Sequence, residues 1–157
     1  MTAPPLYTLL DVVQRYGHRT VLDIPSLTFA EKRIYALQGP NGAGKTTLLN
    51  ILGFLEQPTS GEIAFRGRSV QFNAAALQEL RRDVVLVDQH PILFSTTVYK
   101  NLEFGLKVRN ISAAERRRII EEALEQVGMA DFMHTAATGL SGGETQRVAL
   151  ALSLIHI

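Results

Sequence analysis

The sequence predicts an α/β fold, and three observations support this prediction. The part of the chain up to residue 29 is rich in residues that favour strands. A short apolar run at residues 34–37 then leads through a glycine-rich segment directly into an apolar helical pattern. Helical patterns dominate from residue 97 onward. A strand, a tight turn and a helix in immediate succession form the usual unit of an α/β domain.

Length and composition restrict the kind of protein this is. A chain of 157 residues has the length of one ordinary domain. Its 16 basic and 15 acidic side chains nearly cancel, so charge implies no general attraction to nucleic acid or anionic lipid. The absence of cysteine excludes disulfides, thiolate zinc sites and cysteine nucleophiles, and fits a reducing cytosol. The sequence has no run of about 18 apolar residues, so we expect no bilayer-spanning segment.

Strands are expected in five segments, which combine β-branched and aromatic residues and are bounded by glycine, proline or polar residues. The last of them is a continuous β-branched run, which is typical of a strand buried on both faces of a sheet. The five segments are residues 6–16, 20–29, 34–37, 62–66 and 83–88.

Helices are expected where apolar residues recur at helical spacing. Ser112 and Glu115 form a capping-box pattern at the start of one of them, and Gly128 is expected to end it. The first expected helix begins at residue 47 and ends between residues 53 and 58. Three more are expected at residues 73–82, 97–108 and 113–127.

Three consecutive arginines, at residues 116–118, suggest either a nucleic-acid contact or a solvated helix face of mixed charge. Glu115, Glu121, Glu122 and Glu125 recur around them at helical spacing. Such pairs of opposite charge favour the solvated face.

Residues 39–46 read GPNGAGKT and fit the phosphate-binding pattern G-x-x-x-x-G-K-[ST]. Glycines let the backbone turn so that successive N–H groups face one anion, and the following helix N-terminus adds positive potential. We expect Lys45 to reach the outer phosphates and the Thr46 hydroxyl to bind Mg²⁺. The alternative is a glycine-rich turn that binds nothing. The flanking strand and helix patterns favour a nucleoside triphosphate site.

Residues 140–147 read LSGGETQR and form a second candidate phosphate site. Ser141, Gly142 and Gly143 stand where a helix would begin, with a hydroxyl, unobstructed N–H groups and a positive dipole end. Taken alone, the segment is equally well explained as a capped helix start.

Together the two motifs resemble those of the ATP-binding cassette family, the ATPase subunits of ABC transporters, and the resemblance extends over residues 6–151. It implies a P-loop NTPase core with an N-terminal antiparallel β subdomain and an inserted helical subdomain, incomplete at the C-terminus. It implies ATP and Mg²⁺ as ligands, with Lys45 and Gln89 as catalytic residues and Thr46 and Gln89 as Mg²⁺ ligands. The implied nucleotide contacts are Tyr16, stacked on adenine, and Gly39, Pro40, Asn41, Gly42, Ala43, Gly44, Lys45, Thr46 and Thr47. The implied contacts from a second copy are Ser141, Gly142, Gly143 and Glu144.

The resemblance also implies partners. Two subunits would pair head to tail, so that the Ser141 segment of each closes over the ATP of the other. Residues 91–140 resemble the helical subdomain that contacts a transmembrane permease, with residues 94–98 at the contact. The subunit would thus lie at the inner face of the cell membrane. The segment 89–107 looks most like importers of small oxyanions such as tungstate, molybdate or phosphate, which also use a substrate-binding protein. No nucleic-acid partner is implied.

The chain departs from the family pattern at two places. Glu144 stands where the family's signature has glutamine. After residue 151 the family continues to a Walker B aspartate, a catalytic glutamate and a switch histidine, whereas residues 152–157 read LSLIHI and match none of these. We therefore expect residues 1–90 to be β subdomain and P-loop core, 91–140 helical subdomain, 141–151 signature helix and 152–157 a foreign tail. We further expect weak MgATP binding, negligible hydrolysis, and an exposed apolar end at residues 148–157.

Three alternative functions remain to be compared with a transporter subunit. A soluble ABC-type ATPase of DNA repair would carry a long coiled-coil insertion between Gln89 and Ser141, where this chain has only a compact helical region. A P-loop metabolite kinase would not need the 141–143 motif. A non-catalytic remnant is the third alternative, and the 152–157 ending is what suggests it.

Overall fold

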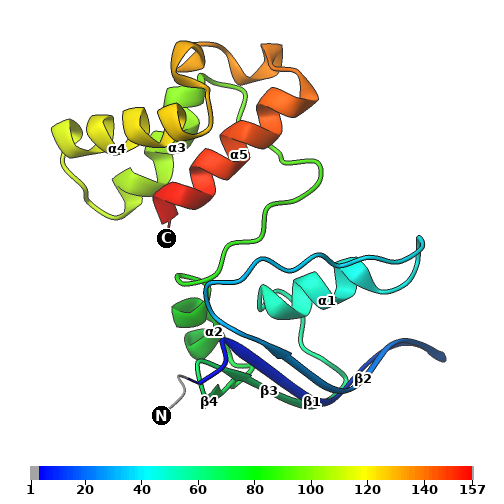
Figure 1. The fold of residues 1–157 in the computed structure, drawn as a ribbon. Coiled ribbons are helices and arrows are strands. Elements are labelled where there is room, and N and C mark those ends of the chain that lie inside the picture. Colours follow the sequence, from blue (N-terminus) through cyan, green and yellow to red (C-terminus); the bar gives the residue numbers. More distant parts are fainter. Residues whose placement is uncertain (1–3, 157) are drawn as a thin grey trace. The chain divides into compact units, whose positions relative to one another are not determined.

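The computed structural model describes residues 4–156, and its contacts divide the chain into two compact units. The N-terminal unit extends to Arg81 and the C-terminal unit begins at Arg82. This division falls before the domain boundary expected near residue 90. Figure 1 shows the helices and strands of both units.

The N-terminal unit contains an antiparallel sheet in the order β2-β1-β3-β4. Strand β1 pairs with β2 from Tyr7 opposite Phe29 to Tyr16 opposite Arg19, which makes the two strands a long hairpin. Three of the five expected strands are thereby confirmed. The strands are β1 (Tyr7–Tyr16), β2 (Arg19–Phe29), β3 (Ser60–Phe65) and β4 (Arg68–Ser69).

The core of this unit lies between the sheet and helix α1 (Lys45–Leu52), which runs along the sheet in Figure 1. The Tyr7 ring packs against Phe54 and Phe65 with centroid distances of 5.9 and 4.9 Å. The Tyr7 hydroxyl donates a hydrogen bond of 2.8 Å to the Leu52 carbonyl, which fastens β1 to the end of α1. Burial raises the pKa of Tyr7 to about 12. A shorter helix, α2 (Ala74–Leu80), follows the sheet.

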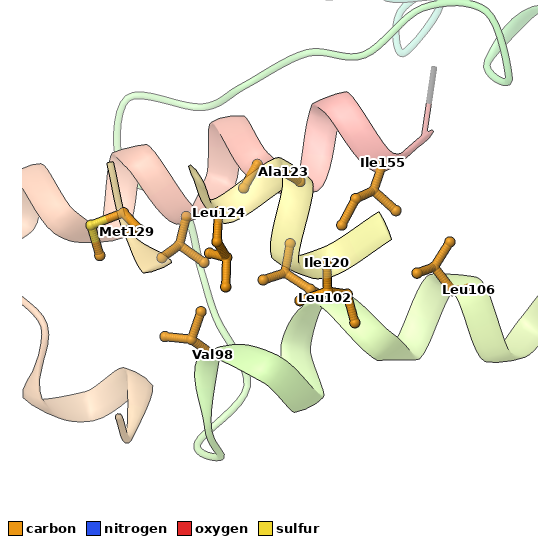
Figure 2. Close-up of a cluster of buried hydrophobic side chains, with 10 residues drawn as sticks. Val98, Leu102, Leu106, Ile120, Ala123, Leu124, Met129 and Ile155 are labelled. Atoms are coloured by element: carbon orange, nitrogen blue, oxygen red, sulfur yellow. The ribbon is translucent and has the colours of Figure 1, made fainter. Parts of the chain in front are cut away.

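The C-terminal unit is helical among its described residues. Apolar side chains three or four residues apart on three helices, together with Met129 after the second of them, form one buried cluster, shown in Figure 2. The most deeply buried side chains include Leu102 of α3 and Ile120 and Leu124 of α4. The elements are α3 (Val98–Val108), α4 (Ala113–Gln126), the short 3₁₀ turns η1 (Ala130–Phe132) and η2 (Ala137–Gly139), and α5 (Gly142–His156). Within residues 4–156, none of the helices has the length and apolar character needed to cross a membrane.

The expected helix ends of this unit are confirmed. The Ser112 hydroxyl accepts a hydrogen bond from the Glu115 N–H, and the chain leaves α4 at Gly128 with a φ of 66°. The arginines of α4 also pair as the mixed-charge interpretation predicted. Arg117 contacts Glu121 and Arg118 contacts Glu122, each at 2.8 Å.

Two of the expected strands do not form. Residues 34–37 and 83–88 have no regular secondary structure, and no backbone ladder pairs with either in the part of the chain that the structure describes. Ile34 and Tyr35 are exposed, as is Val87. A β-branched run becomes a strand only where a neighbouring backbone satisfies its N–H and C=O groups, and sequence pattern alone cannot supply that neighbour.

The expectation of an exposed apolar end at residues 148–157 is wrong for one face of α5. Val148, Ala151 and Ile155 are buried in the helical cluster, whereas Leu150 and Leu154 are exposed. Helix α5 continues through His156, so the segment after residue 151 extends the signature helix. The period of an α-helix, and not the local apolar content, decides which of these side chains are covered.

Candidate functional site

The glycine-rich segment 39–46 forms a tight loop in the N-terminal unit. The Ala43 N–H donates to the Pro40 carbonyl at 3.3 Å, and Gly42 and Gly44 have φ values of 80° and 81°. Gly44 is the N-cap of α1, and its carbonyl accepts the first helical hydrogen bond, from Leu48, at 2.9 Å. Positive φ at these positions favours glycine, and the result is a loop that ends at a helix N-terminus.

Gly44 is required for space as well as for conformation. A Cβ there would lie 2.6 Å from Leu22 Cδ2 and 2.8 Å from the Val21 carbonyl oxygen. At the other end of the loop, a Cβ on Gly39 would lie 3.3 Å from the Cβ of Ala43. The loop therefore closes on itself and packs directly against β2.

Lys45 places its ammonium group at this loop. Its Nζ donates hydrogen bonds of 2.8 Å to the carbonyls of both Gly39 and Pro40. In the described part of the chain no carboxylate pairs with it, so its charge is not neutralised by a neighbour. A cation, a turned backbone and a helix N-terminus in one loop fit the charge and the size of a phosphate group.

The remaining N-terminal candidates lie around the loop. Asn41 is exposed in the loop, and in the first turn of α1 Thr46 is exposed and Thr47 is partly buried. Tyr16 is half exposed and its hydroxyl donates a hydrogen bond to Glu56. Opposite Tyr16 in the hairpin is Arg19, whose Nη2 lies 3.8 Å from the position of a Cβ on Gly42. The structure thus brings the aromatic, the loop and the lysine into one unit.

The signature segment is a complete capping box at the start of α5. The Glu144 Oε2 accepts hydrogen bonds of 2.7 Å from both the N–H and the hydroxyl of Ser141. The Glu144 N–H lies 3.4 Å from the Ser141 Oγ. These bonds hold the pKa of Glu144 below its usual range, chiefly through the Ser141 N–H, with the charge of Arg147 adding to the effect. Two of the donors expected to meet a phosphate are therefore bonded to this carboxylate.

Gln89 lies beside the signature segment in the C-terminal unit. The Gln146 side chain donates a hydrogen bond of 3.0 Å to the Gln89 carbonyl. The two segments border a hollow of about 390 Å³, which is lined by Gln89, His90, Pro91, Leu140, Gly142, Gly143, Thr145 and Gln146. Gln89 and Thr46 belong to different units, so a Mg²⁺ ion shared by them stays a prediction.

Sequence reasoning missed three residues of these arrangements: Arg19, Glu56 and Gln146. Arg19 follows Tyr16 closely and could have been found from the hairpin turn between them. Glu56 had no local signal, because its contact with Tyr16 joins residues 40 positions apart.

Comparison with known proteins identifies the family. A sequence model of the family described as ABC transporter matches residues 22–156. Among curated relatives, the tungstate uptake system ATP-binding protein TupC of Peptoclostridium acidaminophilum is 37% identical over 147 residues, which are 94% of this chain and 65% of that protein. The spermidine/putrescine import ATP-binding protein PotA of Pseudomonas aeruginosa (strain UCBPP-PA14) is 38% identical over 98% of this chain and 41% of its own length. The chain thus spans less than two thirds of either relative.

A solved structure extends the likeness to the fold. The dimeric, post-hydrolysis ATP-binding cassette MJ0796 with bound ADP and Pi has a TM-score of 0.85 and 30% identity, over 96% of this chain and 69% of that one. This likeness confirms the expected fold class, an α/β nucleotide-binding domain with an N-terminal antiparallel sheet and a helical subdomain. With the phosphate loop, the signature segment and the sequence match in agreement, the chain belongs to the ABC transporter family.

Proposed function

We propose that this chain is the ATP-binding part of an ABC transporter ATPase, in which ATP binding and hydrolysis drive solute import through a separate permease. The observation that carries the proposal is the closed loop at residues 39–46 with the Lys45 ammonium against its carbonyls. In the nucleotide complex Lys45 would exchange these carbonyls for phosphate oxygens, and Thr46 would offer its hydroxyl to Mg²⁺. Bound Mg²⁺ would neutralise phosphate charge.

The second half of the proposed site is the Ser141 segment of another copy. Its donors lie at a helix N-terminus, where a phosphate is favoured, and Gly142 and Gly143 leave the backbone unobstructed. The dimeric state of the cassette reported above supports pairing of two copies, and the head-to-tail orientation is part of the proposal. Glu144 would have to release Ser141 before that segment could close over a phosphate.

The proposed permease contact is an apolar groove of the C-terminal unit. Ile92, Phe94, Phe104 and Val108 are all exposed, and they line a groove of about 400 Å³ together with Leu93, Asn101, Gly105, Arg109 and Leu152. Buried Asn101 fixes the segment beside the groove, because its side chain accepts from the Phe94 N–H and donates to the Phe94 carbonyl. Exposed apolar surface of this kind marks an interaction site. Attachment to a permease would place the subunit at the inner face of the membrane.

For the cargo we propose a small oxyanion, supported by the similarity to the tungstate uptake protein. The polyamine relative matches a comparable share of this chain, so the ATPase sequence identifies the cargo less well than the partner proteins would. Neighbouring genes for a permease and an oxyanion-binding protein would support this cargo. A neighbouring polyamine-binding protein would contradict it.

Nucleotide binding tests the proposal on the 157-residue chain itself. Equilibrium dialysis should show weak but saturable MgATP binding, which Lys45→Ala weakens about 10- to 100-fold, as expected for loss of a charge-assisted hydrogen bond worth about 1.5–3 kcal/mol. Lys100→Ala, at an exposed lysine in the other unit, is the matched control and should bind like the wild type. Equal binding by wild type and Lys45→Ala, or no saturable binding by the wild type, would contradict the proposal.

A further inference from the structure

The exposed Tyr16 is held by a hydrogen-bond chain that no local sequence pattern indicates. Its hydroxyl donates to Glu56 Oε1, yet about half of its surface remains exposed. The same Glu56 oxygen accepts a second hydrogen bond, of 2.7 Å, from Gln14 Nε2. Two donors that converge on one oxygen fix the carboxylate, and the fixed carboxylate fixes the phenol.

Gln14 anchors this chain in the interior of the N-terminal unit. It is only 6% exposed, and its Oε1 accepts from the Thr59 N–H at 2.8 Å and from the Thr59 hydroxyl at 3.3 Å. Both ends of its amide are therefore used. A buried amide with all its partners in place adopts one orientation, because rotation would leave polar atoms unpaired.

Glu56 also connects Tyr16 to the phosphate loop. Its backbone N–H donates to the Asn50 carbonyl of α1, the helix that begins at Lys45. From the opposite side, Arg19 pairs with Tyr16 in the hairpin and brings its guanidinium beside Gly42. The aromatic ring is thus placed relative to the loop by two independent routes.

We propose that Glu56, anchored by Gln14, is a positioning residue that holds Tyr16 as a platform for the purine of a bound nucleotide. The inference rests on the proposed function. It adds Glu56 as the residue through which stacking of the purine on Tyr16 strengthens nucleotide binding. A ring already held in place loses less conformational freedom when a base stacks on it. Without Glu56 the phenol would rotate freely, and stacking would have to order it. The competing interpretation is that Glu56 only fastens the segment after α1 to the sheet.

The two interpretations differ in what they predict for ligands with and without a base. The test measures dissociation constants of MgATP and of magnesium tripolyphosphate, which has no base, for the 157-residue chain. Glu56→Ala should weaken MgATP binding about 2- to 10-fold, the cost of ordering one side chain, and leave tripolyphosphate unchanged. Glu56→Gln retains a side-chain oxygen acceptor and should restore most of the MgATP affinity. Glu62→Ala, at an exposed glutamate of β3, is the control.

Tyr16→Phe keeps the test decisive if Glu56→Ala disturbs folding, because it removes only an exposed hydroxyl. It should reproduce the selective loss of MgATP affinity, and the Tyr16→Phe/Glu56→Ala double variant should lose no more than either single variant. The inference is overturned if these variants weaken both ligands equally, or neither, while Lys45→Ala still weakens tripolyphosphate binding. If the wild type binds neither ligand, the proposed function fails, and this inference fails with it.

Discussion

The side-chain amide of Gln146, in α5, donates a hydrogen bond of 3.0 Å to the backbone carbonyl of Gln89. This bond joins two segments that, by the family resemblance, serve two different ATP molecules. Gln89 would contact the ATP bound by its own chain, and the start of α5 would contact the ATP bound by a second copy. One hydrogen bond therefore links the two segments that border this hollow, and a movement of one segment away from the other would break it.

Replacing Gln146 by leucine should loosen the Gln89 segment. The loss of one exposed hydrogen bond, worth about 0.5–1.5 kcal/mol, should speed amide exchange at His90 about 2- to 10-fold. Hydrogen exchange followed by mass spectrometry or NMR measures this rate. Gln126→Leu, at an exposed glutamine of α4, should leave the rate unchanged. An unchanged rate in Gln146→Leu would show that the segment is held by other contacts.

Glu144 should make the stability of the C-terminal unit depend on acid pH. Its pKa is lowered by the Ser141 N–H and hydroxyl, so its stabilising contribution is complete above the ordinary glutamate pKa of about 4.3 and is lost as pH falls through the lower folded pKa. Glu144→Gln keeps a capping side chain without that titration. The thermal midpoint of the wild type should therefore fall more steeply than that of Glu144→Gln below about pH 4.3. Parallel pH profiles would contradict the assignment.

Local chemistry explains why much of the fold was predictable. The cap at Ser112 and the stop at Gly128 depend only on residues within one helical turn, and both are confirmed. The failed strands at residues 34–37 and 83–88 depend on a neighbouring backbone, which their own residues do not specify.

In the candidate site, too, features set by neighbouring residues can be predicted, whereas contacts between distant residues cannot. The phosphate-loop motif consists of consecutive residues, so it can be recognised from the sequence alone. The Gln14–Glu56 contact joins positions 42 residues apart, one in β1 and one after α1, so no local pattern indicates it. The Ser141–Glu144 contact was within reach of the sequence, because serine and glutamate three residues apart form a capping box.

Gly44→Ala should separate steric from conformational demands on the phosphate loop. Gly17 and Gly44 both have positive φ, but a Cβ on Gly17 meets nothing within 4 Å, whereas one on Gly44 would overlap Leu22 and the Val21 carbonyl. Gly17→Ala should cost about 1–2 kcal/mol of unfolding free energy, and Gly44→Ala about 2–5 kcal/mol because overpacking is added. Urea unfolding measures both. Equal losses would show that the loop moves away from β2 without cost.

Ile155→Ala should show that the last turns of α5 belong to the core of the C-terminal unit. Ile155 is buried against the cluster of α3 and α4 in Figure 2, while its neighbour Leu154 is 41% exposed. Truncating Ile155 should lower the unfolding free energy by about 2 kcal/mol or more, because it leaves a cavity between helices. Leu154→Ala should change it by about 0.5 kcal/mol or less. Since both variants remove apolar atoms from adjacent positions, a difference between them can only come from the face of the helix on which each residue lies. Similar small losses in both would show that α5 frays before residue 155 and that its final turns add nothing to the core.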